Sequence, residues 1–117
     1  MMLLVGTEKG LFRLIEDAAA GRWVVDGPHM AGTSVLHTML AGDGTLYAAT
    51  AHKIWGAHIY RSSDHGETWS SLEAVPAHAP ESGRGATKAI WYLAESGTML
   101  FAGSDPAGLF RSEERGE

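Results

Sequence analysis

The stretch GLFR at positions 10–13 recurs along the chain as HIYR at 58–61 and again as GLFR at 108–111. The three copies begin 48 and then 50 residues apart. A second column of similar segments precedes them: LLVGT at 3–7, TLYAAT at 45–50 and TMLFAGS at 98–104. Self-similarity at this period indicates a repeat architecture in which each unit is one supersecondary element.

A third column aligns VLHTMLAGDG at 35–44 with AIWYLAESG at 89–97 and has no counterpart before the first unit. A full unit therefore has four strands, A to D, and a period near 50 is typical of a β-propeller blade. The sequence predicts an all-β fold of four-stranded antiparallel sheets, about two and a half blades in one partial propeller domain over 1–117. The expected units are about 1–27 (strands B to D), 34–76 (A to D) and 86–117 (A to C).

The apolar residues alternate or form short runs bounded by Gly, Asp, Ser and Pro, a pattern that favours strands over helices. Hairpin signals such as GDGT at 42–45 and ESGT at 95–98 separate several of these runs. The segment AHAPESGRG at 77–85 is expected to be a loop that connects two sheets. Ten strands are predicted, near 2–6, 10–16, 22–26, 35–41, 45–50, 57–62, 69–75, 88–94, 98–103 and 108–112.

The composition describes a folded chain and argues against several partners. Of 117 residues, 44% are hydrophobic and 20% are charged, which is too apolar for disorder. The net charge of −5, with nine basic residues scattered singly, disfavours nucleic acid. There is no cysteine, so disulfides and thiolate metal sites are excluded. Neither a signal peptide nor a membrane-spanning run is present, and we expect a cytoplasmic protein without a membrane partner.

The polar segment RSSDHGETW at 61–69 falls where strand C must turn into strand D of the full unit. Its serine and aspartate oxygens can accept bonds from turn N–H groups, and its glycine can adopt a left-handed backbone. The indole can fill the gap between neighbouring sheets. We therefore interpret Ser62, Asp64, Gly66 and Trp69 as a structural turn, not as a catalytic cluster.

These four residues match S-x-D-x-G-x-x-W, and the chain resembles the N-terminal part of the BNR/Asp-box, sialidase-like repeat β-propeller proteins. LLVGTEKGLFRL, GDGTLYAAT and LFAGSDPAGLFRS also carry the resemblance. In such proteins the Asp box lies at the blade periphery, away from the ligand-binding mouth. True sialidases use an arginine triad that begins in an Arg-Ile-Pro motif. Here Leu14 and Ile15 follow Arg13 without a proline, so the resemblance implies the fold more than the activity.

The flanking units carry altered copies of the box. EDAAAGRW at 16–23 keeps an aspartate, a glycine and Trp23, and RSEERGE at 111–117 aligns with RSSDHGE at 61–67. Arg13, Arg61 and Arg111 occupy one position in the three repeats. We expect them to be structural arginines near the box.

Propeller topology predicts where a ligand would bind, because the D-to-A and B-to-C connections open at one mouth of the channel. These connections are 27–34, 51–57, 76–87 and 104–107. Their aromatic, imidazole and charged side chains suit a carbohydrate or a small anionic ligand. The candidates, with two residues of the innermost strands, are His37, His52, Trp55, His58, Glu81, Arg84 and Trp91.

The sequence favours a non-enzymatic module for ligand or protein recognition, without metal or cofactor, because no histidine pair has metal-ligand spacing. The alternative is a sialidase-like glycoside hydrolase with a site shared between chains. A retaining glycosidase needs two carboxyl groups facing one sugar. In the mouth segments only Glu81 and Asp105 qualify as catalytic candidates.

The incomplete first and last units lead to a prediction about assembly. A closed propeller typically has four to eight blades, and exposed sheet edges and faces invite pairing. We expect a homo-oligomer that closes into a ring, a dimer first and a trimer second. A partner chain that supplies the remaining blades is the other possibility.

Overall fold

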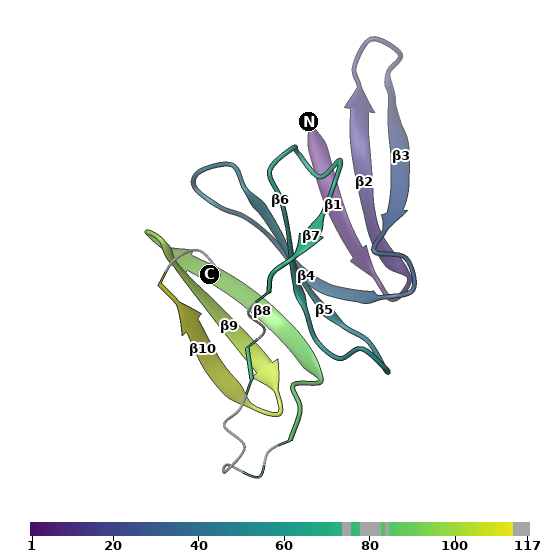
Figure 1. The fold of residues 1–117 in the computed structure, drawn as a ribbon. Coiled ribbons are helices and arrows are strands. Elements are labelled where there is room, and N and C mark those ends of the chain that lie inside the picture. Colours follow the sequence, from purple (N-terminus) through teal and green to yellow (C-terminus); the bar gives the residue numbers. More distant parts are fainter. Residues whose placement is uncertain (74–75, 78–82, 84, 114–117) are drawn as a thin grey trace.

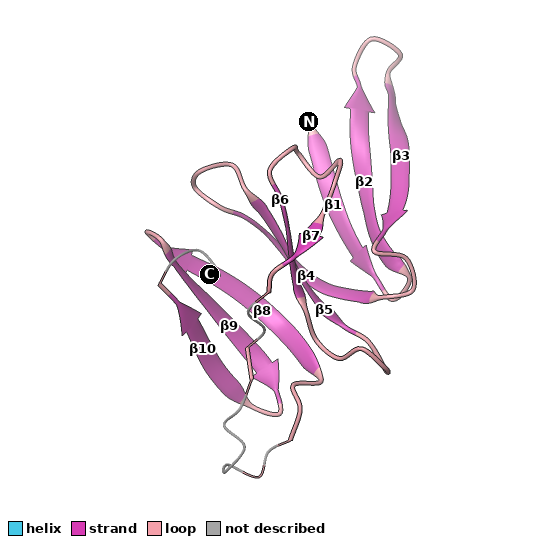
Figure 2. Ribbon diagram, viewed as in Figure 1, coloured by secondary structure: helices cyan, strands magenta, loops and turns pink. Residues whose placement is uncertain are grey.

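A computed structural model describes residues 1–73, 76–77, 83 and 85–113 of the chain. Within these residues the fold consists of strands and contains no helix, as Figure 2 shows. The expectation of an all-β fold is confirmed. The strands are β1 (Met2–Thr7), β2 (Gly10–Asp17), β3 (Arg22–His29), β4 (Ser34–Leu40), β5 (Leu46–Ala51), β6 (Ile59–Ser62), β7 (Ser70–Ser71), β8 (Ala89–Ser96), β9 (Met99–Asp105) and β10 (Gly108–Ser112).

All strand pairs are antiparallel and follow the chain order in three groups. β1, β2 and β3 form a three-stranded sheet, here named the first sheet. β4 to β7 pair in succession as the middle sheet, and β8 to β10 as the third sheet. One pair, Ala51 with Ala89, joins the middle and third sheets into a single seven-stranded sheet. That these groups are propeller blades remains a prediction.

The three groups lie side by side in a row, with the middle sheet between the other two (Figure 1). The row measures 57 × 32 × 19 Å and its radius of gyration is 14.9 Å. A compact domain of this length would have a radius of gyration of about 13 Å. The chain is therefore an elongated stack of sheets.

The repeated segments occupy the same ladder positions in each sheet. The aromatic third residue of each tetrapeptide lies opposite a small or branched residue of the preceding strand: Val5 opposite Phe12, Ala48 opposite Tyr60, and Ala102 opposite Phe110. Because side chains alternate between the faces of a strand, one shared register puts matching residues on matching faces. The three sheets thus share a strand register as well as a sequence pattern.

The core forms two layers, one on each side of the middle sheet. Tyr47 and Ala49 of β5 belong to the cluster shared with the third sheet, which includes Ile90, Leu93 and other residues of β8 and β9. Ala48, between them on β5, points to the other face and packs with Leu11 of the first sheet and Val35 of β4. β5 is therefore buried on both faces, which explains its unbroken apolar run.

Gly6 shows how closely the first sheet approaches the middle one. A Cβ atom built on Gly6 would lie 2.5 Å from the carbonyl oxygen of Val35. No side chain fits there without moving β1 away from β4. Glycine at this position is therefore a packing requirement.

The predicted strands match the observed ones apart from their ends. β7 is shorter than the expected 69–75, although Leu72 still donates a backbone hydrogen bond to Ile59 at 2.8 Å. β3 continues to His29, three residues beyond the expected end, because Leu11 still pairs with His29 after a bulge. Of the predicted loop 77–85, only residues 77, 83 and 85 are among the described residues, and none of them is in a strand.

Candidate functional site

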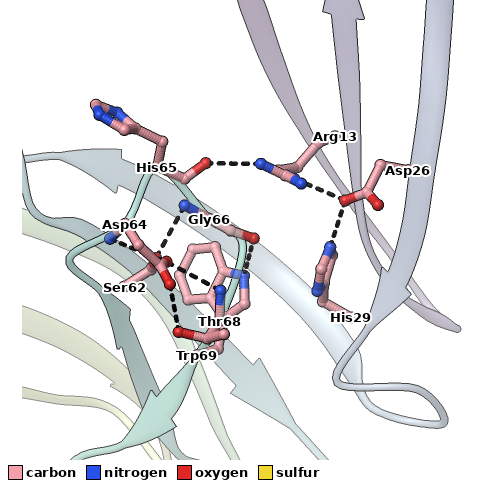
Figure 3. A network of polar contacts seen from close by, with 9 residues as sticks. All are labelled: Arg13, Asp26, His29, Ser62, Asp64, His65, Gly66, Thr68 and Trp69. Atoms are coloured by element: carbon pink, nitrogen blue, oxygen red, sulfur yellow. Dashed lines mark hydrogen bonds and ion pairs between the residues drawn. The ribbon is translucent and has the colours of Figure 1, made fainter.

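The turn between β6 and β7 is held by bonds among its own side chains and backbone (Figure 3). The Ser62 hydroxyl, 2% exposed, accepts a bond from the Gly66 N–H at 2.9 Å and donates to Asp64 at 2.7 Å. Asp64 accepts two further bonds, from the backbone N–H and the hydroxyl of Thr68. The Trp69 indole N–H donates to the Gly66 carbonyl at 3.0 Å. The polar side chains of Ser62, Asp64, Thr68 and Trp69 thus all have partners within the turn.

The charge of Asp64 is stabilised by these bonds. The hydroxyl of Ser62, then the hydroxyl and N–H of Thr68, lower the pKa of the Asp64 carboxyl well below its ordinary value of 3.8. A carboxylate so stabilised is a poor proton donor or acceptor near neutral pH. The geometry favours a structural role for the turn over a catalytic one.

Arg13 connects the first sheet to this turn, as Figure 3 shows. Its Nη1 donates to the His65 carbonyl at 3.1 Å, and its Nε donates to Asp26 at 2.7 Å. The His29 ring lies 2.6 Å from the same Asp26 oxygen. The bond with His29, followed by that with Arg13, lowers the pKa of Asp26. The network ties two neighbouring sheets together.

A different part of the molecule forms an open cavity of about 910 Å³. Four segments line it: the β1–β2 turn, the connection from β3 to β4, the loop after β5 and the segment before β8. Its lining residues are Glu8, Lys9, Gly32, Ser34, Ala51, His52, Lys53, Ile54, Gly56, Ala86, Thr87 and Lys88. We name it the lysine cavity, because Lys9, Lys53 and Lys88 are all three of the lysines in the chain.

Backbone hydrogen bonds hold the segments that carry these lysines. The Gly32 N–H donates to the Lys9 carbonyl at 3.2 Å, and the Lys88 N–H donates to the Asp105 carbonyl at 2.7 Å. The loop of Lys53 is joined to the segment before β8 by a 3.3 Å bond from the Ala57 N–H to the Thr87 carbonyl. The backbone beside each lysine is therefore held by main-chain contacts, and one of these, from Ala57 to Thr87, joins the middle sheet to the third.

The net charge of the residues that line this cavity has the opposite sign to the net charge of the whole chain. The chain carries a net charge of −5, yet three basic residues and one acidic residue, Glu8, line this cavity. Among the described residues no ion pair joins any of the three lysines to a carboxylate. Such a concentration of like charge attracts anions.

A smaller cavity of about 350 Å³ adjoins the lysine cavity, and His52 lines both. We name it the aromatic cavity; its lining is Thr33, His52, Trp55, His58, Tyr60 and Ser71. The Nδ1 of His52 accepts bonds from the N–H groups of Ile54 and Trp55 at 3.0 and 3.1 Å. In the neutral ring the proton is then on Nε2, which is left to donate to a ligand.

Three of the predicted ligand-binding residues thus come together, namely His52, Trp55 and His58. His37 lies elsewhere, because its Nε2 contacts the Leu93 carbonyl at 3.2 Å and its ring stacks on Tyr92 at 4.3 Å. Trp91 on β8 is 54% exposed and lines neither cavity.

Of the predicted carboxylate pair, Asp105 alone is among the described residues. Asp105 ends β9, is exposed and lines neither cavity. Glu81 and Arg84 lie outside the described residues.

Sequence reasoning missed Glu8, Lys9 and Lys88 as lining residues. The turn EKG at 8–10 is the B-to-C connection of the first unit and corresponds to 51–57 of the second, so the repeat itself contained the signal for the first two. Lys88 was assigned to the start of a predicted strand.

The sequence matches no protein-family model, and no curated protein has a significantly similar sequence. No cluster of three or more histidines and carboxylates that could hold a metal ion occurs in the described residues. In the same part of the chain, no helix is long and apolar enough to cross a membrane.

Proposed function

We propose that this protein is a non-enzymatic recognition module of the Asp-box propeller type and that it binds a small acidic carbohydrate. The observation that carries the proposal is the position of all three lysines of the chain on one cavity beside His52 and Trp55. The lysines supply charge, and the neighbouring aromatic cavity supplies a surface for a sugar ring.

The chemistry of the two cavities supports an acidic sugar over other small ligands. The Trp55 side chain is 72% exposed and its ring lies 6.3 Å from that of His52, so its indole is accessible for stacking on a sugar. A carboxylate or phosphate on that sugar would meet the ammonium groups of the adjoining cavity. A neutral sugar would use the aromatic surface alone.

Catalysis receives less support from the same residues. A glycosidase of the retaining or inverting kind needs two carboxyl groups facing the scissile bond. Among the described residues Glu8 is the single carboxylate that lines either cavity. The sialidase-like alternative would therefore depend on Glu81 with Asp105, or on a second chain.

The proposal treats the first, middle and third sheets as propeller blades. Two observations support it: the same strand register recurs in the three sheets, and β5 of the middle sheet is buried on both faces. In a propeller each blade packs face to face on its neighbours, and the strand connections at one end form the mouth. The lysine cavity is lined by such connections.

Calorimetric titration with N-acetylneuraminic acid, glucose 6-phosphate and glucose tests the proposed ligand class. We expect the two acidic sugars to bind more tightly than glucose. Lys53→Met should weaken the acidic sugars about two- to fivefold, since one exposed charge interaction contributes about 0.5–1 kcal/mol. Raising the salt concentration should weaken them further.

Arg22→Met is the matched control, because Arg22 is exposed and lies at the opposite end of β3 from the cavity. Equal affinity for glucose and the acidic sugars, or equal loss in the control, would contradict the proposal. Hydrolysis of a fluorogenic sialoside that is lost in Glu81→Gln would support the glycosidase alternative instead.

A further inference from the structure

We propose that the outer face of the third sheet docks on the outer face of the first sheet of a second copy of this chain. The contact would repeat the packing that already joins the sheets within one chain. This inference rests on the proposed repetition of the sheets and is independent of the proposed ligand.

One apolar position of the repeated tetrapeptide is buried in two sheets and exposed in the third. The second residue of the repeated tetrapeptide is Leu11 in the first sheet and Ile59 in the middle sheet, with exposed fractions of 0% and 5%. Both pack toward the next sheet along the chain. Leu109, at the same position of the third sheet, is 77% exposed. Among the described residues, therefore, this face is covered in the first and middle sheets and uncovered in the third.

On the opposite face of the first sheet, apolar residues are exposed whose counterparts in the other two sheets are buried. Val5 is 38% exposed, whereas its counterparts Ala48 and Ala102 are 0% and 5% exposed. Leu3 is 47% exposed, and Leu46 and Leu100 at the same position are 5% exposed each. Leu14 and Val25 extend this apolar face, because Leu3 pairs with Leu14 and Leu14 pairs with Val25. Trp23, aligned with the partly buried Trp69, is 43% exposed.

The repeated arginine indicates the same direction of packing. Arg13 reaches from the first sheet to the Asp-box turn of the middle sheet, and its side chain is 11% exposed. Arg111, at the matching position of the third sheet, is 64% exposed and has a 3.5 Å ion pair with Glu113. Docked on a second copy, Arg111 would face the β2–β3 turn at 18–21, which corresponds to the Asp-box turn.

A second copy fits these faces because the chain itself contains both halves of the contact. The chain exposes 7110 Å², about 900 Å² more than a compact monomer of this mass. Burial of that excess on both copies would remove about 1,800 Å² in the whole dimer, divided between two contacts, and this total lies within the standard range of about 1,200–2,000 Å². The contact joins unlike faces, so two copies related by a twofold axis make it twice and close a ring.

Size-exclusion chromatography with light scattering at micromolar concentration tests this contact. Wild type should have twice the chain mass of 12.5 kDa. Leu109→Asp and Val5→Asp should each give folded monomers. The dimer contains the contact twice, and either substitution places a carboxylate in both of these contacts. Leu40→Asp, at an exposed leucine outside both faces, should leave the dimer intact.

Mixing the two monomeric variants discriminates between modes of docking. The third sheet of Val5→Asp and the first sheet of Leu109→Asp are both unaltered, so an equimolar mixture should form a mixed dimer through one contact. If the contact instead joined like faces, one of the two single variants would remain a dimer. A monomeric wild type, a dimer of either single variant, or a mixture that stays monomeric would overturn the proposal.

Circular dichroism of each variant distinguishes loss of docking from loss of folding. Both substituted positions are exposed in one chain, so their strand signal should match that of wild type. A failed acidic-sugar titration would leave these masses unchanged, so failure of the docking contact and failure of the proposed ligand can be told apart.

Discussion

Gly66 lies where the β6–β7 turn meets Arg13. Substitution there has two separable effects on the free energy of unfolding, one from the backbone conformation and one from the contact. Its φ angle is +85°, a left-handed backbone that costs a non-glycine residue about 1–2 kcal/mol. A Cβ atom would also lie 3.0 Å from Cδ of Arg13 and 3.4 Å from Cζ2 of Trp69. Gly44 has a φ of +90° with nothing within 4 Å of its Cβ position, so Gly44→Ala carries the backbone cost alone.

Gly66→Ala should therefore lower the free energy of unfolding by about 1–3 kcal/mol more than Gly44→Ala. The excess comes from displacement of Arg13, whose bond to the His65 carbonyl is charge-assisted and stabilises by about 1.5–3 kcal/mol. Urea denaturation followed by tryptophan fluorescence measures both variants. The protein concentration must be the same throughout, because self-association adds to apparent stability.

A double-mutant cycle with Arg13→Ala checks the cause. In that background the two glycine variants should lose similar free energy, because the side chain that Gly66→Ala displaces is gone. An excess that persists without Arg13, or no excess in the wild-type background, would refute the assigned contact.

Two further variants test the turn and the approach of the sheets. The pKa of Asp64 is lowered by Ser62 and Thr68, so its stabilisation is complete above its ordinary pKa of 3.8 and is lost as the pH falls through its folded pKa. The stability difference between wild type and Asp64→Asn should be constant above about pH 5 and shrink in acid; a constant difference down to pH 2 would contradict this linkage. Gly6→Ala should destabilise by about 1–3 kcal/mol through overpacking against the Val35 carbonyl, measured by thermal unfolding.

Gly103 provides the control for the last variant. It occupies the position of Gly6 in the third sheet and has no atom within 4 Å of its Cβ position. Both glycine variants are therefore compared in the monomeric Leu109→Asp background, because Gly103 pairs with Leu109 on the proposed docking face. There Gly103→Ala should leave the melting temperature within a degree or two. Equal loss in the two variants would show that strand propensity, not the contact with Val35, sets the cost of an alanine.

The strands and their order were predictable because the signals for them are local. Period-two apolar patterns and glycine turns mark each strand, and the recurrence of GLFR and HIYR marks the units. The internal bonds of the β6–β7 turn were also predictable, since its residues lie within eight positions of one another. Each of these features depends on neighbours in the sequence.

The contacts between sheets were not predictable in the same way. Arg13 lies 52 residues from His65, whose carbonyl it contacts. Nothing in the spacing of the repeats indicates that Arg13 contacts the turn of the middle sheet and not the turn of its own sheet. The position of Lys9, Lys53 and Lys88 on one cavity was not predictable for the same reason, because it depends on how the sheets pack against one another. Sequence periodicity defines a unit, while the packing between units defines the site.

Nitrogen-15 NMR titration with N-acetylneuraminic acid tests most directly whether the lysine cavity is a recognition site. We predict that the amide shifts of Lys9, Lys53 and Lys88, and the indole N–H of Trp55, change together with one dissociation constant. Amides of the β6–β7 turn at 62–69 should not change. Shifts confined to that turn, or no shifts at a concentration that saturates binding measured by calorimetry, would contradict the proposed site.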